Sequence, residues 1–130
     1  MLTIKLEEKP QNALSEMGVE ADSESFVMTM YDGDVLMGVG VMKLFYECAE
    51  ICGVYIKEEF NDFSLAYGMG KSLLNAVDLR GIRHVYSDNS DMDALLRALR
   101  FKKWDECNPP EDMEKHLCYL NLTGYFDANC

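Results

Sequence analysis

The chain has 130 residues, 48% of them hydrophobic and 27% charged, which is typical of a globular protein and too apolar for a disordered one. Its 23 acidic and 12 basic side chains give a net charge of −11. This charge argues against binding to nucleic acid or to an anionic membrane surface, because both depend on Lys and Arg. It is compatible with a cationic small molecule or a basic peptide as partner.

The same features predict a single domain, residues 1–130, in the cytoplasm. The sequence lacks a run of about 18 apolar residues that could span a membrane, and its N-terminal segment turns acidic at Glu7 without an apolar signal core. Five cysteines without a CxxC pair favour free thiols in a reducing compartment. His84 and His116 complete no known zinc-ligand spacing, so we expect no metal.

The first half of the chain predicts mainly strands. Alternating or unbroken apolar residues predict strands at residues 2–6, 26–30, 35–46 and 48–56. A short helix is predicted over residues 10–18, where Gly18 closes it, and Asp32-Gly33-Asp34 predicts a hairpin turn. The run at residues 48–56 carries one charge, Glu50, so we expect it in the middle of the sheet, with a bulge at Gly53.

The second half of the chain alternates helices with short strands. A helical period begins at about Ala66 and ends at Gly81, and a second helix carries Met92, Leu95, Leu96 and Leu99 on one face. Strands are predicted at residues 82–86, 101–104 and 117–122. The strand–helix–strand unit at 48–86 requires a parallel pair, whereas the hairpins around it are antiparallel. We therefore expect an α/β (α+β) fold, with a mixed, mostly antiparallel sheet of six to seven strands and helices on both faces.

Residues 68–72, Gly-Met-Gly-Lys-Ser, are expected at the junction between a loop and the first long helix. The free N–H groups and positive dipole of a helix start can bind phosphate, and glycines let the ligand approach the backbone. The pattern is not a nucleotide-binding P-loop, because the glycine required five residues before Gly70 is Leu65. It also lacks the third glycine of a dinucleotide fingerprint. The glycines could equally serve a tight turn and close helix packing.

In the order of its elements and in three motifs, the chain resembles the GNAT-superfamily N-acetyltransferases over roughly residues 24–122. Residues 65–70 are similar to the family's Q/R-x-x-G-x-G/A acetyl-CoA motif, and Ala49-Glu50-Ile51 resembles the strand that carries the catalytic glutamate of the histone acetyltransferases. Ser87-Asp88-Asn89 leads into a helix that resembles the family's N-x-x-A-x-x-x-Y segment. The sequence departs from the family at Leu65, where Gln or Arg is usual, and at Leu96, where a tyrosine often protonates the leaving thiolate.

This resemblance implies a splayed central parallel pair of strands, with acetyl-CoA as co-substrate in the gap and no metal. The residues that it would bring to the cofactor are Val54, Tyr55, Ile56, Leu65, Ala66, Tyr67, Gly68, Met69, Gly70, Lys71, Ser72 and Asn89. The pantetheine amides would pair with the strand at 54–56, and the diphosphate would lie on the N–H groups of residues 66–72. Lys71 and Ser72 could instead be exposed to solvent, and Asn89 could be only a helix cap.

Glu50 is the candidate catalytic base, because an apolar surrounding makes a carboxylate a stronger base. It could also face solvent or pair with Lys43, and the sequence assigns no general acid. The implied function is an acetyl-CoA-dependent N-acetyltransferase that moves an acetyl group to a primary amine of a small cationic molecule or lysine. The alternative is a catalytically weak or silent GNAT-fold module that binds acyl-CoA or a protein. The short stretch between the first two strands is compatible with a homodimer that completes the acceptor site.

Overall fold

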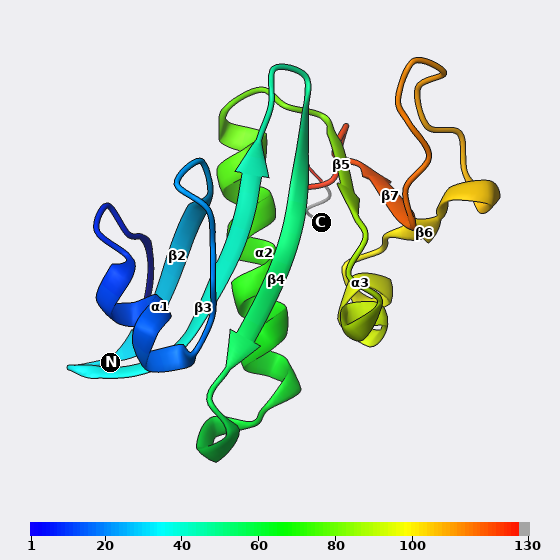
Figure 1. The fold of residues 1–130 in the computed structure, drawn as a ribbon. Helices are drawn as coiled ribbons and strands as arrows, with labels where there is room; N and C mark the ends of the chain where they lie inside the picture. The colour runs from blue at the N-terminus through cyan, green and yellow to red at the C-terminus, as the bar shows by residue number, and fades with distance from the viewer. Residues whose placement is uncertain (128–130) are drawn as a thin grey trace.

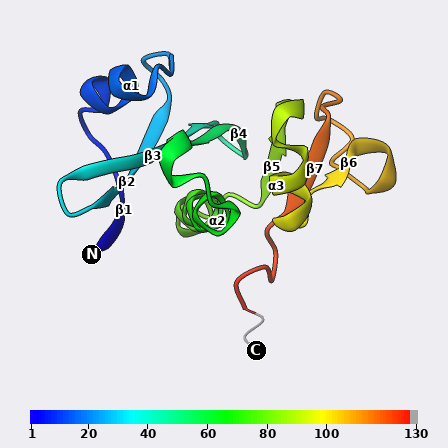
Figure 2. The same cartoon turned by 90° about the horizontal axis from the view of Figure 1, so that it is seen from below.

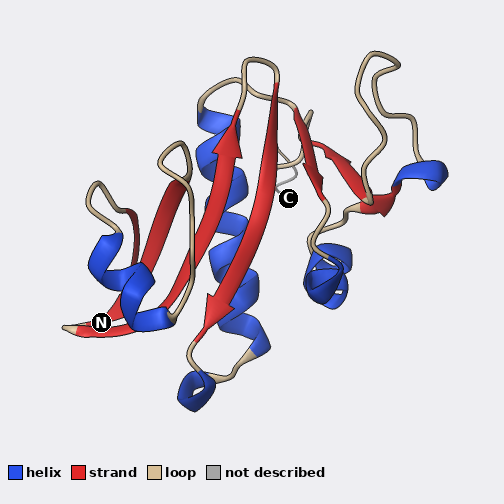
Figure 3. Cartoon of the chain, viewed as in Figure 1, coloured by secondary structure: helices blue, strands red, loops and turns tan. Residues whose placement is uncertain are grey.

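The computed structural model describes residues 1–127 as a seven-stranded mixed sheet in the order β1-β2-β3-β4-β5-β7-β6, with helices on its faces (Figure 1). The strands are β1 (Leu2–Leu6), β2 (Phe26–Asp32), β3 (Val35–Leu44), β4 (Cys48–Ile56), β5 (His84–Ser87), β6 (Lys102–Lys103) and β7 (Cys118–Asn121). The helices are α1 (Gln11–Met17), α2 (Phe63–Leu79) and α3 (Asp93–Ala98), with short 3-10 turns η1 (Glu58–Phe60), η2 (Ser90–Met92) and η3 (Trp104–Glu106). The predicted mixed, mostly antiparallel sheet is confirmed (Figure 3).

Glycines at three chain reversals account for the element ends that the sequence predicts. Gly18 ends α1 with a φ of 67°, Gly33 turns the β2–β3 hairpin with a φ of 61°, and Gly81 follows α2 with a φ of 77°. These left-handed values are strained for any residue with a Cβ atom. The glycines therefore fix where one helix stops and the next strand begins.

The helices cover both faces of the sheet, as predicted. Seen from below, α1 and α2 lie on opposite sides of it (Figure 2). On the α2 side, Met69, Leu73 and Val77 are fully buried at the helical spacing that the sequence shows. A smaller apolar cluster lies under α1 and consists of Ala13, Val27, Leu36, Val39 and Val41. Burial of each large side chain stabilises the fold by about 1.5–3 kcal/mol.

The central parallel pair is splayed, as expected. β4 pairs with β5 only from Cys48 to Glu50, although it pairs with β3 as far as Ile56. A shift in the β3–β4 register leaves Cys52 as an additional residue of β4, one position before the predicted bulge at Gly53. A bulge bends its strand and strengthens the local twist. The second half of β4 thus turns away from β5 just beyond Glu50.

Several further expectations concern the chain as a whole. Within residues 1–127, no helix is both long and apolar enough to cross a bilayer, and no group of three or more His, Cys, Asp or Glu side chains could hold a metal ion. The cysteines at positions 48, 52, 107 and 118 are free thiols. Cys130 lies outside the described residues.

Candidate active site

Side chains replace backbone pairing where β4 and β5 part. The Ser87 hydroxyl donates to the carbonyl oxygen of Ile51 at 2.7 Å, and Asn89 Nδ2 donates to the carbonyl oxygen of Cys52 at 2.9 Å. The other side of the Asn89 amide caps η2, because its Oδ1 accepts from the Asp91 N–H at 3.0 Å. Asn89 therefore caps η2 and also links the end of β5 to β4 by a hydrogen bond where the two strands separate.

We expect Asn89→Asp to lower the free energy of unfolding by about 1–3 kcal/mol. The variant keeps the acceptor that caps η2, but it loses the donor to Cys52 and sets a charged oxygen against a carbonyl. Urea unfolding measures the effect, with Asn75→Asp on the exposed side of α2 as the control, expected within about 0.5 kcal/mol of the wild type. Equal stabilities for the two variants would show that Asn89 does not tie the strands.

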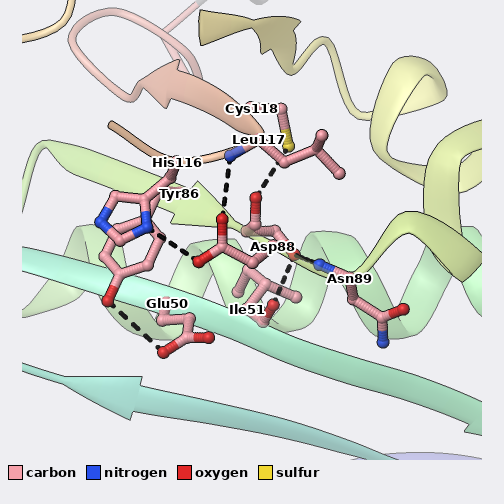
Figure 4. Close-up of polar contacts among 9 residues, drawn as sticks. Glu50, Ile51, Tyr86, Asp88, Asn89, His116, Leu117 and Cys118 are labelled. Carbon is pink, nitrogen blue, oxygen red and sulfur yellow. Dashed lines mark hydrogen bonds and ion pairs between the residues drawn. The ribbon is translucent and has the colours of Figure 1, made fainter. Parts of the chain in front are cut away.

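Glu50 meets Tyr86 at the start of the splay (Figure 4). The β4–β5 register sets these residues opposite each other, and the Tyr86 hydroxyl donates to Glu50 Oε1 at 3.4 Å. Burial, and then the nearby Glu50 charge, raise the pKa of Tyr86 well above its usual value, so the phenol is a hydrogen-bond donor at neutral pH. Lys43, the pairing partner that the sequence left open for Glu50, binds Asp22 instead, with Nζ 2.6 Å from Oδ2.

A histidine lies on the other side of the same tyrosine ring. His116 stacks on Tyr86 with ring centroids 3.7 Å apart and planes inclined by 16°. Its Nδ1 is 2.8 Å from Asp88 Oδ2, and Asp88 Oδ1 accepts from the Leu117 N–H at 2.9 Å (Figure 4). The sequence predicts no role for Asp88 or His116. The predicted strands alone could have indicated that the two residues are close. If the strands at 82–86 and 117–122 pair antiparallel, as β5 and β7 do, residue 116 lies near the end of β5.

The cysteine beside Glu50 is not an alternative nucleophile. Burial raises the pKa of Cys52 to about 11, with a smaller contribution from the Glu50 charge. At neutral pH the thiol is protonated, whereas the thiolate is the nucleophilic form. The polar chemistry of the splay therefore rests on Glu50 and Tyr86.

The glycine motif does not lie at the mouth of the helix, and this part of the prediction is wrong. α2 begins at Phe63, so residues 68–72 occupy its interior, where each N–H bonds the carbonyl four residues before it. Gly70 is buried, and a Cβ atom on it would lie 2.7 Å from Leu99 Cδ1, while a Cβ atom on Gly68 would meet nothing within 4 Å. Gly70 thus allows close packing of α2 on α3, which is the alternative that the sequence left open.

The polar residues of the motif also engage the protein itself. Ser72 Oγ donates to the carbonyl oxygen of Gly68 at 2.9 Å. Lys71 Nζ lies over the rings of Tyr125, Phe126 and Tyr67, at 4.5, 5.2 and 5.8 Å from their centroids. Such cation–π contacts hold the ammonium toward the C-terminal segment. The structure therefore does not place Lys71 and Ser72 at the first turn of α2, where a helix-bound diphosphate would lie.

A carboxylate caps that first turn. Asp62 Oδ1 accepts from the N–H and the hydroxyl of Ser64 at 2.8 and 2.7 Å, and the Asp62 carbonyl accepts from the N–H groups of Leu65 and Ala66. The hydrogen bonds from Ser64 hold the pKa of Asp62 below its usual range, so the cap is charged at neutral pH. An anion on this turn would meet a negative charge and N–H groups that already have acceptors.

The three strand residues predicted to face the cofactor lie on the free half of β4. Val54, Tyr55 and Ile56 pair with β3 on one side and lie beyond the β5 pairing on the other. Val54 and Ile56 pack toward the main core, while Tyr55 folds its ring over Gly53. Their backbone edge is therefore the segment of β4 that an extended ligand could pair with.

Of the comparisons with known proteins, the one with solved structures finds similar proteins, and these share one fold. No protein-family model matches the sequence, and a comparison with curated protein sequences finds no relative. Among solved structures, a Bacillus subtilis acetyltransferase in complex with CoA is 16% identical, with a TM-score of 0.69, and the match covers 94% of this chain and 99% of that one. A GNAT family acetyltransferase from Elizabethkingia anophelis with acetyl-CoA bound is 10% identical, with a TM-score of 0.65 and coverages of 93% and 98%.

An enzyme with a stated acceptor has the same architecture. The ribosomal-protein-S18-alanine N-acetyltransferase from Escherichia coli is 12% identical, with a TM-score of 0.66, over 92% of this chain and 90% of that one. Similarity at these low identities establishes an architecture and not an acceptor. These matches span most of the chain with TM-scores of 0.65 to 0.69: the chain has the fold of the GNAT-family acetyltransferases.

Proposed function

We propose that the chain is an acetyl-CoA-dependent N-acetyltransferase, a single domain over residues 1–130 that acetylates a primary amine of a small cationic molecule or a basic peptide. The observation that carries this proposal is the Glu50 carboxylate at the start of the splay, with the Tyr86 hydroxyl on one of its oxygens. The GNAT fold of the chain supports the same assignment. The net charge of −11 favours a cationic acceptor.

Glu50 has the chemistry of a general base in this reaction. Acetyl-CoA supplies the acetyl group as a thioester, and the attacking amine must first lose a proton. Glu50 takes that proton, directly or through one water molecule, with the oxygen that Tyr86 does not hold. The amine nitrogen then bonds to the acetyl carbon, the C–S bond breaks, and CoA leaves as a thiolate that takes a proton from solvent. Tyr86 remains a donor and orients the carboxylate through a long hydrogen bond of 3.4 Å. Bringing the amine and the acetyl group together in the splay supplies much of the remaining acceleration.

The free edge of β4 favours binding of acetyl-CoA, whereas the negative charge at the first turn of α2 opposes it. The backbone at Val54–Ile56 would pair with the pantetheine amides as an added strand does. The diphosphate would lie near the first turn of α2, where Asp62 is charged and Glu58 and Glu59 precede it in η1. We therefore propose that acetyl-CoA binds weakly, since like charges oppose its phosphates.

We expect Asp62→Asn to tighten CoA binding about three- to tenfold, because it removes a negative charge that repels the phosphates. The repulsion between two unit charges about 4 Å apart in water is roughly 1 kcal/mol. Asparagine is as good a helix cap as aspartate, so α2 keeps its first turn. Isothermal titration with CoA measures the change, and Glu111→Gln in the exposed loop before β7 is the control of equal charge. Unchanged affinity in Asp62→Asn would place the phosphates away from this helix end.

The second candidate function is that of a GNAT-fold module that binds acyl-CoA or a protein partner without catalysing acetyl transfer. The charged cap at Asp62 and Leu96 in place of the tyrosine general acid favour it. Chromatographic detection of acetylated product and free CoA, with a panel of amines, separates the two functions without interference from the protein's own thiols. Turnover on any amine supports the enzyme, while thermal stabilisation by acetyl-CoA without product supports an acyl-CoA-binding module. If neither turnover nor stabilisation is observed, the protein-interaction module is the function that remains.

A further inference from the structure

We infer that Asp88 and His116 form a positioning pair that holds Tyr86 against the catalytic base, Glu50. The inference rests on the proposed acetyltransferase function and adds two residues to it. Within residues 1–127, neither residue has a hydrogen bond or ion pair with Glu50. They act through the tyrosine, whose ring lies between the histidine on one side and the carboxylate at its hydroxyl (Figure 4).

Asp88 fixes both the ring and the backbone of the loop that carries His116. Because an ionised carboxylate only accepts hydrogen bonds, Nδ1 of His116 carries the proton and donates to Asp88 Oδ2 at 2.8 Å. The second oxygen accepts from the Leu117 N–H at 2.9 Å. One side chain at the end of β5 therefore sets the position and the tilt of the imidazole.

The imidazole in turn fixes the phenol. It stacks on Tyr86 with ring centroids 3.7 Å apart, and Trp104 meets it edge-on with ring centroids 5.5 Å apart. Tyr86 is only 8% exposed, and the stacked imidazole covers one face of its ring. The Tyr86 hydroxyl then stays on Glu50 Oε1, and the other carboxylate oxygen is left for the amine.

Positioning of this kind affects the chemical step more than cofactor binding. Displacement of a catalytic group by about 1 Å can lower a rate by as much as 10²-fold. The pair lies at the Glu50 end of the splay, whereas Val54–Ile56 and Asp62 lie at the proposed cofactor end. Loss of the pair should therefore reduce kcat and leave the KM for acetyl-CoA unchanged.

The test is a double-mutant cycle between His116 and Tyr86. We expect His116→Ala to lower kcat about tenfold in the wild-type background and by less than about twofold in the Tyr86→Phe background, because the lost contact acts through the hydroxyl. His116→Phe keeps the stacked ring but loses the hydrogen bond to Asp88, so its kcat should lie between that of His116→Ala and that of the wild type. Fluorescence of Trp104, the only tryptophan, checks in each variant that the fold is intact and that its neighbour has changed.

Two results would overturn the inference. In one, His116→Ala leaves kcat unchanged, and in the other it lowers kcat equally in both backgrounds while the wild type is active. In either case the proposed function stands and the positioning role is wrong. Absence of turnover by the wild type on every amine is a different failure: it removes the proposed function, and the positioning role falls with it.

Discussion

Glu50→Gln is expected to lower kcat for amine acetylation by about 10²–10³-fold, within the range that general base catalysis supplies. Glutamine has the same shape, and its amide oxygen still accepts from the Tyr86 hydroxyl, so the start of the splay is preserved. The variant cannot take a proton from the amine. Steady-state rates at saturating acetyl-CoA, with the product measured by chromatography, give the change.

The control for this variant is Glu47→Gln. Glu47 is exposed in the turn between β3 and β4, three residues before Glu50. Its replacement by glutamine therefore removes one negative charge close to Glu50 but outside the sheet. A comparable loss in both variants would attribute the effect to the local field rather than to a base.

The pH dependence of the loss gives a second check on Glu50. A primary amine has a pKa of about 10, so its neutral fraction rises with pH and less help is needed from the enzyme. The difference between wild type and Glu50→Gln should shrink as the pH is raised from 7 toward 10. A difference that stays constant over this range would exclude Glu50 as the base.

The sheet and the position of Glu50 could be predicted because the signals are local and strong. The run at residues 48–56 is almost wholly apolar, which is typical of a central strand, and its single charge marks Glu50. The parallel pair follows from the strand–helix–strand order. Fold and candidate base therefore follow from periodicity, composition and connection rules.

The start of α2 was missed because two sequence signals conflict there. Asp62 is a good helix cap, but the resemblance of residues 65–70 to a cofactor turn, and the cost of about 1 kcal/mol for each glycine in a helix, favour a later start. Packing decides the outcome, since α2 buries Met69 and Gly70 against its neighbours. No local pattern contains that contact.

The Asp88–His116 pair was missed for a related reason. His116 belongs to a loop without periodicity, and its partner lies 28 residues away in the chain. A contact of this kind depends on the register of β5 against β7, which sequence spacing alone does not fix. The residues around Glu50 are therefore harder to predict than Glu50 itself.

Gly70→Glu is expected to destabilise the fold by at least about 3 kcal/mol, because it places an unpaired charge in the core. The matched substitution is Gly68→Glu, two residues earlier on the same helix, where a side chain meets open space. That change replaces a helical glycine by a better helix former and should raise stability by up to about 1 kcal/mol.

Urea unfolding of the two variants distinguishes a helix interior from a cofactor turn. In the helix, Gly70 packs against Leu99 and Gly68 does not, so the two stabilities must differ strongly. In an exposed turn before the helix, both glutamates would face solvent, and the two variants would unfold at similar urea concentrations. A large difference therefore means that the N–H groups of residues 68–72 make hydrogen bonds within α2, and that these residues do not bind the phosphates of acetyl-CoA.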